Sequence, residues 1–285
     1  MKEIRVIAHN PEMTDMVEML ANVPYASPDG EQLAMQILKP MWKPEGNGFP
    51  LVLFIQGSAW TKPDQFWQIP QLSLLARRGF VIASVTHRSS ATSPAPAFLQ
   101  DVKAALRFLR AHASEYGIDG DRVCAWGTSS GGNTALLLGL TGDDPAYETA
   151  DWAGHSTRVQ AVVDCFGPTD LNRMLEKDYW GGDEGDKTLL YDLGGGKTPE
   201  AYRERLREIS PICRIEPGRE LPPFLLLHGD ADSVVFYGDT EALYRKLAEC
   251  GYDAELVRVT NAPHEDTFWG PELLEIIFDF IQKRV

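Results

Sequence analysis

The feature that most constrains this chain is the sequence Gly-Thr-Ser-Ser-Gly at residues 127–131, because of the segments that flank it. Residues 122–126 are typical of a short buried strand, and residues 132–138 begin an apolar helix. Gly-x-Ser-x-Gly between a strand and a helix predicts a sharp turn that strains the serine backbone and requires small residues around it. The Ser129 hydroxyl then stands clear of the sheet above a helix N-terminus, whose dipole favours negative charge. The pattern therefore predicts that Ser129 is a nucleophile.

Strand and helix signals alternate along most of the chain. Such alternation predicts an α/β fold with a mostly parallel central sheet and helices on both of its faces. In sheets of this kind the functional loops lie at the carboxyl ends of the strands. The expected strands are 32–39, 51–55, 80–85, 123–126, 159–166, 224–227 and 254–259, and the expected helices are 71–78, 98–112, 239–250 and 271–283.

Two segments depart from this alternation. Residues 1–25 carry apolar side chains at a loosely helical spacing, which favours an N-terminal helix or arm packed on the body; a role in a substrate entrance or subunit contact is the alternative. Residues 168–220 hold many charges and glycines and one helical stretch at 199–209, which indicates a small cap inserted between two strands. The 285 residues suit a single domain, 1–285, that contains both segments.

The composition limits the classes of partner and substrate that we expect. The formal net charge of −14 repels phosphate backbones and anionic membranes, so we expect no nucleic acid or membrane partner and a neutral or cationic substrate. No apolar run approaches the ~20 residues of a membrane span, and residues 1–10 lack a signal-peptide core, so a cytoplasmic location is expected. We expect no metal and no cofactor. Four cysteines show no metal-ligand spacing and are expected to be reduced, structural thiols: Cys124, Cys165, Cys213 and Cys250.

A serine nucleophile needs a base to accept its proton and a carboxylate to orient that base. His264 follows the strand expected at 254–259, at the edge where the serine should lie. His228 directly follows the strand 224–227, and we interpret it as a packing residue. The loop after that strand offers two aspartates; Asp232 is the expected partner of His264, and Asp230 is expected to brace the turn.

Acyl transfer also requires hydrogen-bond donors aimed at the developing oxyanion. The backbone N–H of Ser130, which follows the nucleophile, is one expected donor. Further donors should come from the loop after the buried strand 51–55, where small residues let the main chain approach a bound carbonyl. We expect these to be the amides of Ser58 and Ala59.

Together these residues resemble the α/β-hydrolase superfamily, and within it the bacterial serine esterases of the hormone-sensitive-lipase and feruloyl-esterase-like type. The resemblance extends from about Tyr25 to the C-terminus and is most specific at 80–88, 101–119, 127–131, 228–235 and 261–264. It implies that Ser129 is the nucleophile, His264 the general base and Asp232 the orienting acid. One departure concerns the oxyanion loop, commonly His-Gly-Gly-Gly or His-Gly-Gly-Ala in the family. Here Gln56 and Ser58 replace the histidine and the second glycine, which puts the bracing of the loop in question.

The resemblance implies a serine carboxylesterase for short-chain or aromatic acyl esters, with carbohydrate esters among the substrates. A serine peptidase of the oligopeptidase type and a non-catalytic binding protein on the same fold are the alternatives. The oligomeric state is left open. Four aromatic residues are expected near the rim of the site and would form a short, flat acyl pocket, although about half should belong to the core: Trp60, Trp180, Phe268 and Trp269.

Overall fold

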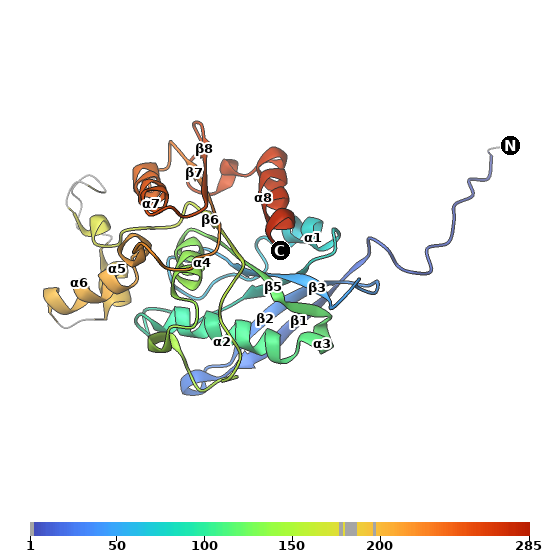
Figure 1. The fold of residues 1–285 in the computed structure, drawn as a ribbon, viewed down its shortest axis with the longest axis horizontal. Helices are drawn as coiled ribbons and strands as arrows, with labels where there is room; N and C mark the ends of the chain where they lie inside the picture. The colour runs from blue at the N-terminus through green and yellow to red at the C-terminus, as the bar shows by residue number, and fades with distance from the viewer. Residues whose placement is uncertain (1–2, 177–178, 180–186, 196–197) are drawn as a thin grey trace.

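The computed structural model describes residues 3–176, 179, 187–195 and 198–285 and contains an eight-stranded sheet in the order β1-β2-β4-β3-β5-β6-β7-β8 (Figure 1). Strand β2 runs antiparallel to both of its neighbours, and the strands from β4 to β8 are parallel. The strands are β1 (Val17–Ala26), β2 (Leu33–Pro40), β3 (Phe49–Ile55), β4 (Val81–Val85), β5 (Ile118–Thr128), β6 (Ala161–Cys165), β7 (Phe224–Gly229) and β8 (Ala254–Val259).

Helices cover both faces of this sheet, as the alternation predicts. Apolar side chains of α1 and α8 pack on one face, and those of α2, α4 and α7 form the core on the other (Figure 1). The α/β-hydrolase architecture is therefore confirmed. The helices are α1 (Ile69–Ala76), α2 (Ala97–Ala111), α3 (Ala113–Tyr116), α4 (Ser130–Thr141), α5 (Thr188–Gly194), α6 (Pro199–Glu208), α7 (Tyr237–Glu249) and α8 (Pro271–Arg284). In the described part of the chain, no helix has the length and apolar character needed to cross a membrane.

The N-terminal segment differs from the helix that its spacing favours. Residues 3–16 form no helix and project from the body, and Val17–Ala26 is the edge strand β1 (Figure 1). Met19 pairs with Leu38 of β2, and the only fully buried side chain of the strand is Tyr25, whose hydroxyl donates to the Thr86 carbonyl at 2.7 Å. Of the helix or arm that we expected, the helix is not formed, and residues 17–26 pack on the body as a strand. Pairing with the open edge of β2 satisfies backbone groups that a short, marginally stable surface helix would have to satisfy alone.

The expected insertion lies between β6 and β7. It holds α5 and α6, and α6 matches the helix predicted at 199–209, with Thr198 accepting a hydrogen bond from the Ala201 amide as its N-cap. Tyr179 ties the insertion to α7, since its hydroxyl donates to Asp239 at 2.7 Å and its ring stacks on Phe236. Trp180, expected at the rim of the site, lies outside the described residues.

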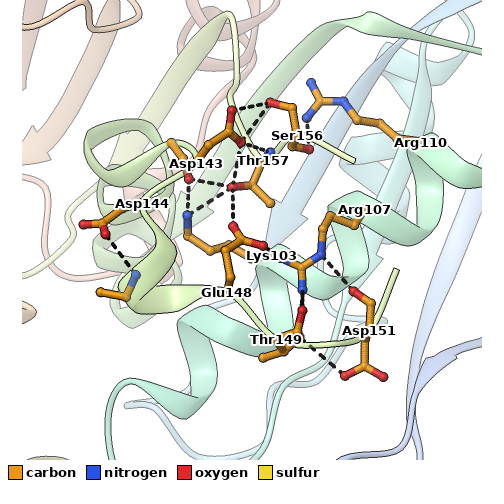
Figure 2. Close-up of polar contacts among 12 residues, drawn as sticks. Lys103, Arg107, Arg110, Asp143, Asp144, Glu148, Thr149, Asp151, Ser156 and Thr157 are labelled. Carbon is orange, nitrogen blue, oxygen red and sulfur yellow. Dashed lines mark hydrogen bonds and ion pairs between the residues drawn. The ribbon is translucent and has the colours of Figure 1, made fainter. Parts of the chain in front are cut away.

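Two buried cations of α2 fix the long connection that follows α4 (Figure 2). The Lys103 ammonium donates to Thr157 Oγ1 at 3.1 Å, and burial lowers the pKa of this amine to about 8. The Arg107 guanidinium pairs with Glu148 and donates to the Asp151 carbonyl at 2.9 Å. Because buried charges need such partners, these contacts anchor the connection to the helix that packs beside α4.

Candidate active site

Ser129 occupies the turn between β5 and α4. Its backbone has φ 51° and ψ −125°, a strained conformation for a residue with a side chain, and its N–H donates to the Cys165 carbonyl of the neighbouring strand at 2.9 Å. The turn is too tight for side chains around it: a Cβ at Gly127 would lie 2.0 Å from the Gly131 carbonyl oxygen, and one at Gly131 would lie 2.0 Å from the Ile55 carbonyl oxygen. The chain therefore needs glycine at both positions to form this turn.

The structure brings Ser129, His264 and Asp232 together from the carboxyl ends of three parallel strands. Ser129 Oγ lies 3.0 Å from His264 Nε2, and His264 Nδ1 lies 2.7 Å from Asp232 Oδ2. Because the carboxylate accepts a hydrogen bond from Nδ1–H, which keeps the proton on that nitrogen, Nε2 is left with a lone pair that can accept the serine proton. This geometry is that of a nucleophile, a general base and an orienting acid.

The Asp232 carboxylate is buried and receives four hydrogen bonds. Its Oδ1 accepts from the amides of Val234 and Val235 at 2.8 and 3.0 Å, and its Oδ2 accepts from His228 Nε2 at 3.1 Å as well as from His264. Burial alone would raise the pKa of Asp232, but the bonds from the two histidines and the backbone outweigh it and hold this pKa well below its usual range. The carboxylate is therefore ionised whenever the protein is folded near neutral pH.

Asp230 lies on the same loop but points to a different set of partners. Its carboxylate pairs with Arg258 at 2.6 Å and accepts from the Asn261 amide at 2.6 Å. These contacts join the loop after β7 to the loop after β8, which carries His264. Asp230 thus braces the turn, as expected from the sequence.

The loop after β3 is held by the hydroxyls on either side of the nucleophile. The Gly57 amide donates to Thr128 Oγ1 at 2.8 Å, and the Ser58 amide donates to Ser130 Oγ at 2.9 Å. Of the three predicted oxyanion donors, the Ser58 amide is therefore already paired. For the amides of Ala59 and Ser130, the described residues supply no acceptor, so these two remain available. Ala59 also has a strained φ of 50°.

The aromatic residues expected near the rim divide between the core and the surface, and two of them do not line the site. Trp60 and Phe268 are each 2% exposed, so they belong to the core and not to the rim. Trp60 has φ 54°, and its ring packs towards Phe98 of α2. Of the three that the structure describes, Trp269 alone is partly exposed, and its indole N–H donates to Glu265 at 2.9 Å.

Phe166 is a residue that the sequence reasoning missed. It directly follows β6, is fully buried, and places its ring 4.7 Å from the His264 ring in an edge arrangement. The Phe268 ring also packs against Phe166, with the two ring centroids 4.7 Å apart. This aromatic contact fixes the plane of the His264 imidazole. The position of Phe166 at the carboxyl end of a strand is the sequence feature from which its place in the site could have been predicted.

Comparison with known proteins agrees with this geometry. The family model described as BD-FAE matches residues 35–247, well over half of the chain. The chain belongs to the BD-FAE family. This BD-FAE chain is thereby placed among the α/β-hydrolases, which agrees with the resemblance seen in the sequence.

Individual relatives of this BD-FAE chain are esterases by name. Esterase LipC of Mycobacterium tuberculosis is 32% identical over 188 residues, which are 65% of this chain and 45% of LipC. The chain thus spans about half the length of the curated relatives it matches. A truncated carbohydrate esterase from gut microbiota superposes with a TM-score of 0.78 at 27% identity, covering 96% of this chain and 98% of that structure. Propionate-bound Est2 of Thermogutta terrifontis gives a TM-score of 0.74 at 26% identity, covering 96% of each.

Proposed function

We propose that this protein is a serine carboxylesterase. The observation that carries the proposal is the hydrogen-bonded line from Ser129 Oγ through His264 to the buried Asp232 carboxylate. Two backbone amides find no acceptor among the described residues, that of Ala59 on the loop after β3 and that of Ser130 next to the nucleophile, and they suit the binding of an oxyanion. The esterase names of relatives from two comparisons support the same reaction.

In the proposed reaction, Ser129 Oγ attacks the ester carbonyl carbon while its proton passes to His264 Nε2. The resulting imidazolium is stabilised by the Asp232 carboxylate, and the oxyanion accepts hydrogen bonds from the two amides. When the tetrahedral intermediate collapses, the bond to the alcohol oxygen breaks and His264 returns the proton to that oxygen. Water then loses a proton to His264, adds to the acyl-enzyme, and releases the acid while Ser129 recovers its proton.

We further propose short-chain or aromatic acyl esters as substrates, with carbohydrate alcohols among the leaving groups. The named activity of the carbohydrate esterase and the propionate bound to Est2 favour these classes. A hollow of about 360 Å³ beside the His264 loop has lining suited to a sugar ring, since aromatic faces stack on it and amides bind its hydroxyls: Trp67, Gln68, Gln71, Asp266 and Trp269. The net charge of −14 favours an uncharged ester over nucleic acid.

The test combines active-site labelling with turnover. A fluorophosphonate probe should label the wild-type protein at Ser129, and p-nitrophenyl acetate should be hydrolysed. Ser129→Ala should lose both while keeping the thermal unfolding midpoint of the wild type. Absence of labelling would favour a non-catalytic binding protein, and faster cleavage of peptides than of esters would favour a peptidase.

A further inference from the structure

His228 is fully buried at the end of β7, and both of its ring nitrogens have partners. Nε2 lies 3.1 Å from Asp232 Oδ2 and 2.9 Å from the Val235 carbonyl oxygen. On the other side, Nδ1 lies 2.7 Å from the hydroxyl oxygen of Thr240, in the first turn of α7. A packing residue would not need this complete set of polar contacts.

The partners determine where the ring proton lies. Both neighbours of Nε2 are acceptors, so Nε2 carries a proton and donates it. The Thr240 hydroxyl can rotate to donate to Nδ1. The ring is therefore oriented from α7 and directs its N–H at the carboxylate.

Oxygen Oδ2 of Asp232 thus accepts from two histidines, and the other oxygen is fixed by the amides of Val234 and Val235. These hydrogen bonds come from the loop after β7, from His228 at the end of β7, and from His264. His228 supplies the one donor to Oδ2 that does not itself take part in the proton transfer of the proposed reaction.

We propose that His228 is a positioning residue: its Nε2–H holds the Asp232 carboxylate in the orientation that receives His264 Nδ1, and Thr240 holds the His228 ring. This inference rests on the proposed esterase function. Loss of the donor leaves Oδ2 free to turn away from His264, which weakens control of the imidazole tautomer on which proton transfer depends.

The first experiment compares two substitutions. His228→Leu removes the donor, and we expect kcat for p-nitrophenyl acetate to fall by about 10- to 100-fold with little change in KM. His228→Gln places an amide N–H near the position of Nε2, and kcat should recover to within about threefold of the wild type. Equal loss in both variants, or a loss confined to KM, would overturn the proposal.

A double-substitution cycle separates positioning from general support of the fold. In an Asp232→Ala background, where the carboxylate is absent, adding His228→Leu should change the residual kcat by less than about twofold. A further loss as large as that in the wild-type background would show that His228 acts by another route.

A third variant keeps the imidazole and therefore tests the proposal even if His228→Leu does not fold. Thr240→Val removes the hydroxyl that orients the ring, and we expect a smaller fall in kcat that also vanishes in the Asp232→Ala background. Unchanged kcat in Thr240→Val together with unchanged kcat in His228→Leu would refute the proposal. If the wild-type protein neither cleaves esters nor reacts with a fluorophosphonate, the esterase function itself fails, which is a distinct result.

Discussion

The backbone N–H of Ser58 donates to the side-chain oxygen of Ser130 across 2.9 Å, which ties the loop after β3 to the residue that follows the nucleophile. The same loop replaces the family's usual histidine with Gln56, and its neighbouring amide, that of Gly57, is held by Thr128. The loop is thus braced from the β5–α4 turn itself. In the proposed reaction the Ser58 amide can meet an oxyanion only after leaving Ser130.

Replacing Ser130 with Ala should therefore raise kcat for short esters by about three- to tenfold. The substitution removes the ground-state acceptor of the Ser58 amide, and only interactions that strengthen in the transition state accelerate the reaction. Steady-state kinetics with p-nitrophenyl acetate measure the change. A fall of tenfold or more would instead indicate that the hydroxyl is required in the oxyanion site.

Thr128→Val should have the opposite effect. This change keeps the side-chain volume but removes the acceptor of the Gly57 amide, which leaves a partly buried N–H without this partner beside Ser129. We expect kcat to fall by about tenfold because the Gly57 N–H loses its acceptor and the position of the loop beside Ser129 is less well fixed. Kinetics and thermal unfolding of both variants, measured side by side, show whether the two hydroxyls act differently.

Asp232→Asn should lower kcat by about three to four orders of magnitude. An amide at this position cannot stabilise the imidazolium and favours the wrong tautomer of His264. Asp230→Asn is the matched control, because it alters the same loop but contacts Arg258 and Asn261 instead of either histidine. Its kcat should stay within about tenfold of the wild type, since an exposed ion pair contributes little. A more severe loss in Asp230→Asn at equal stability would contradict the assignment of the acid.

Asp164 should make stability depend on pH. This carboxyl lies fully buried on β6, accepts from the Gly167 amide at 3.0 Å, and has its pKa raised to about 8 by burial. Between about pH 4 and pH 8 the unfolded chain releases a proton that the folded protein keeps, so the free energy of unfolding falls as pH rises through this window. Asp164→Asn cannot ionise and should lack this fall. Urea unfolding at pH 5 and pH 8 tests it; equal pH dependence in the two proteins would argue against a buried protonated carboxyl.

Acetyl to butyryl esters should be cleaved at least about tenfold faster than esters of ten or more carbons. Phe166 packs against the His264 ring and Phe268 packs against Phe166, and both are buried, so aromatic side chains occupy this side of the base in the described part of the chain. Methylene groups that stay in water gain no binding energy, whereas each buried one would gain about 0.8 kcal/mol. A chain-length series of p-nitrophenyl esters measures the preference. Faster turnover of the long esters, with activation at a lipid interface, would point to a lipase.

Local sequence patterns predicted the parallel strands and the positions of Ser129, Asp232 and His264 because each follows from a strand end or a turn motif. The edge strand β1 was not predictable in this way. The spacing of Met13, Met16 and Met19 is compatible with a helix and with an extended chain. Pairing with the open edge of β2 decides in favour of the strand, and that pairing depends on residues distant in the sequence.

The roles of His228 and Trp60 were also hidden from the sequence. The loop after β7 turns back so that Asp232, four residues after His228, meets the His228 ring. Only the folded loop shows that Nε2 is the nitrogen that contacts the carboxylate. Trp60 turns into the core through a positive φ, a conformation that residue type did not suggest for tryptophan.

The position of the insertion between β6 and β7 has a consequence for diversification. The described residues 167–222 donate or accept no hydrogen bond with Ser129, Asp232 or His264, which come from the ends of β5, β7 and β8. The described part of this segment instead meets the reactive centre indirectly: Asn133, in the helix that follows Ser129, donates to the Pro168 and Ile209 carbonyls at 2.9 and 3.1 Å, and Tyr179 donates to Asp239 of α7. A change in the insertion would therefore reach the nucleophile through α4 and its neighbours, so variation there is expected to tune ester preference most freely away from these three contact points.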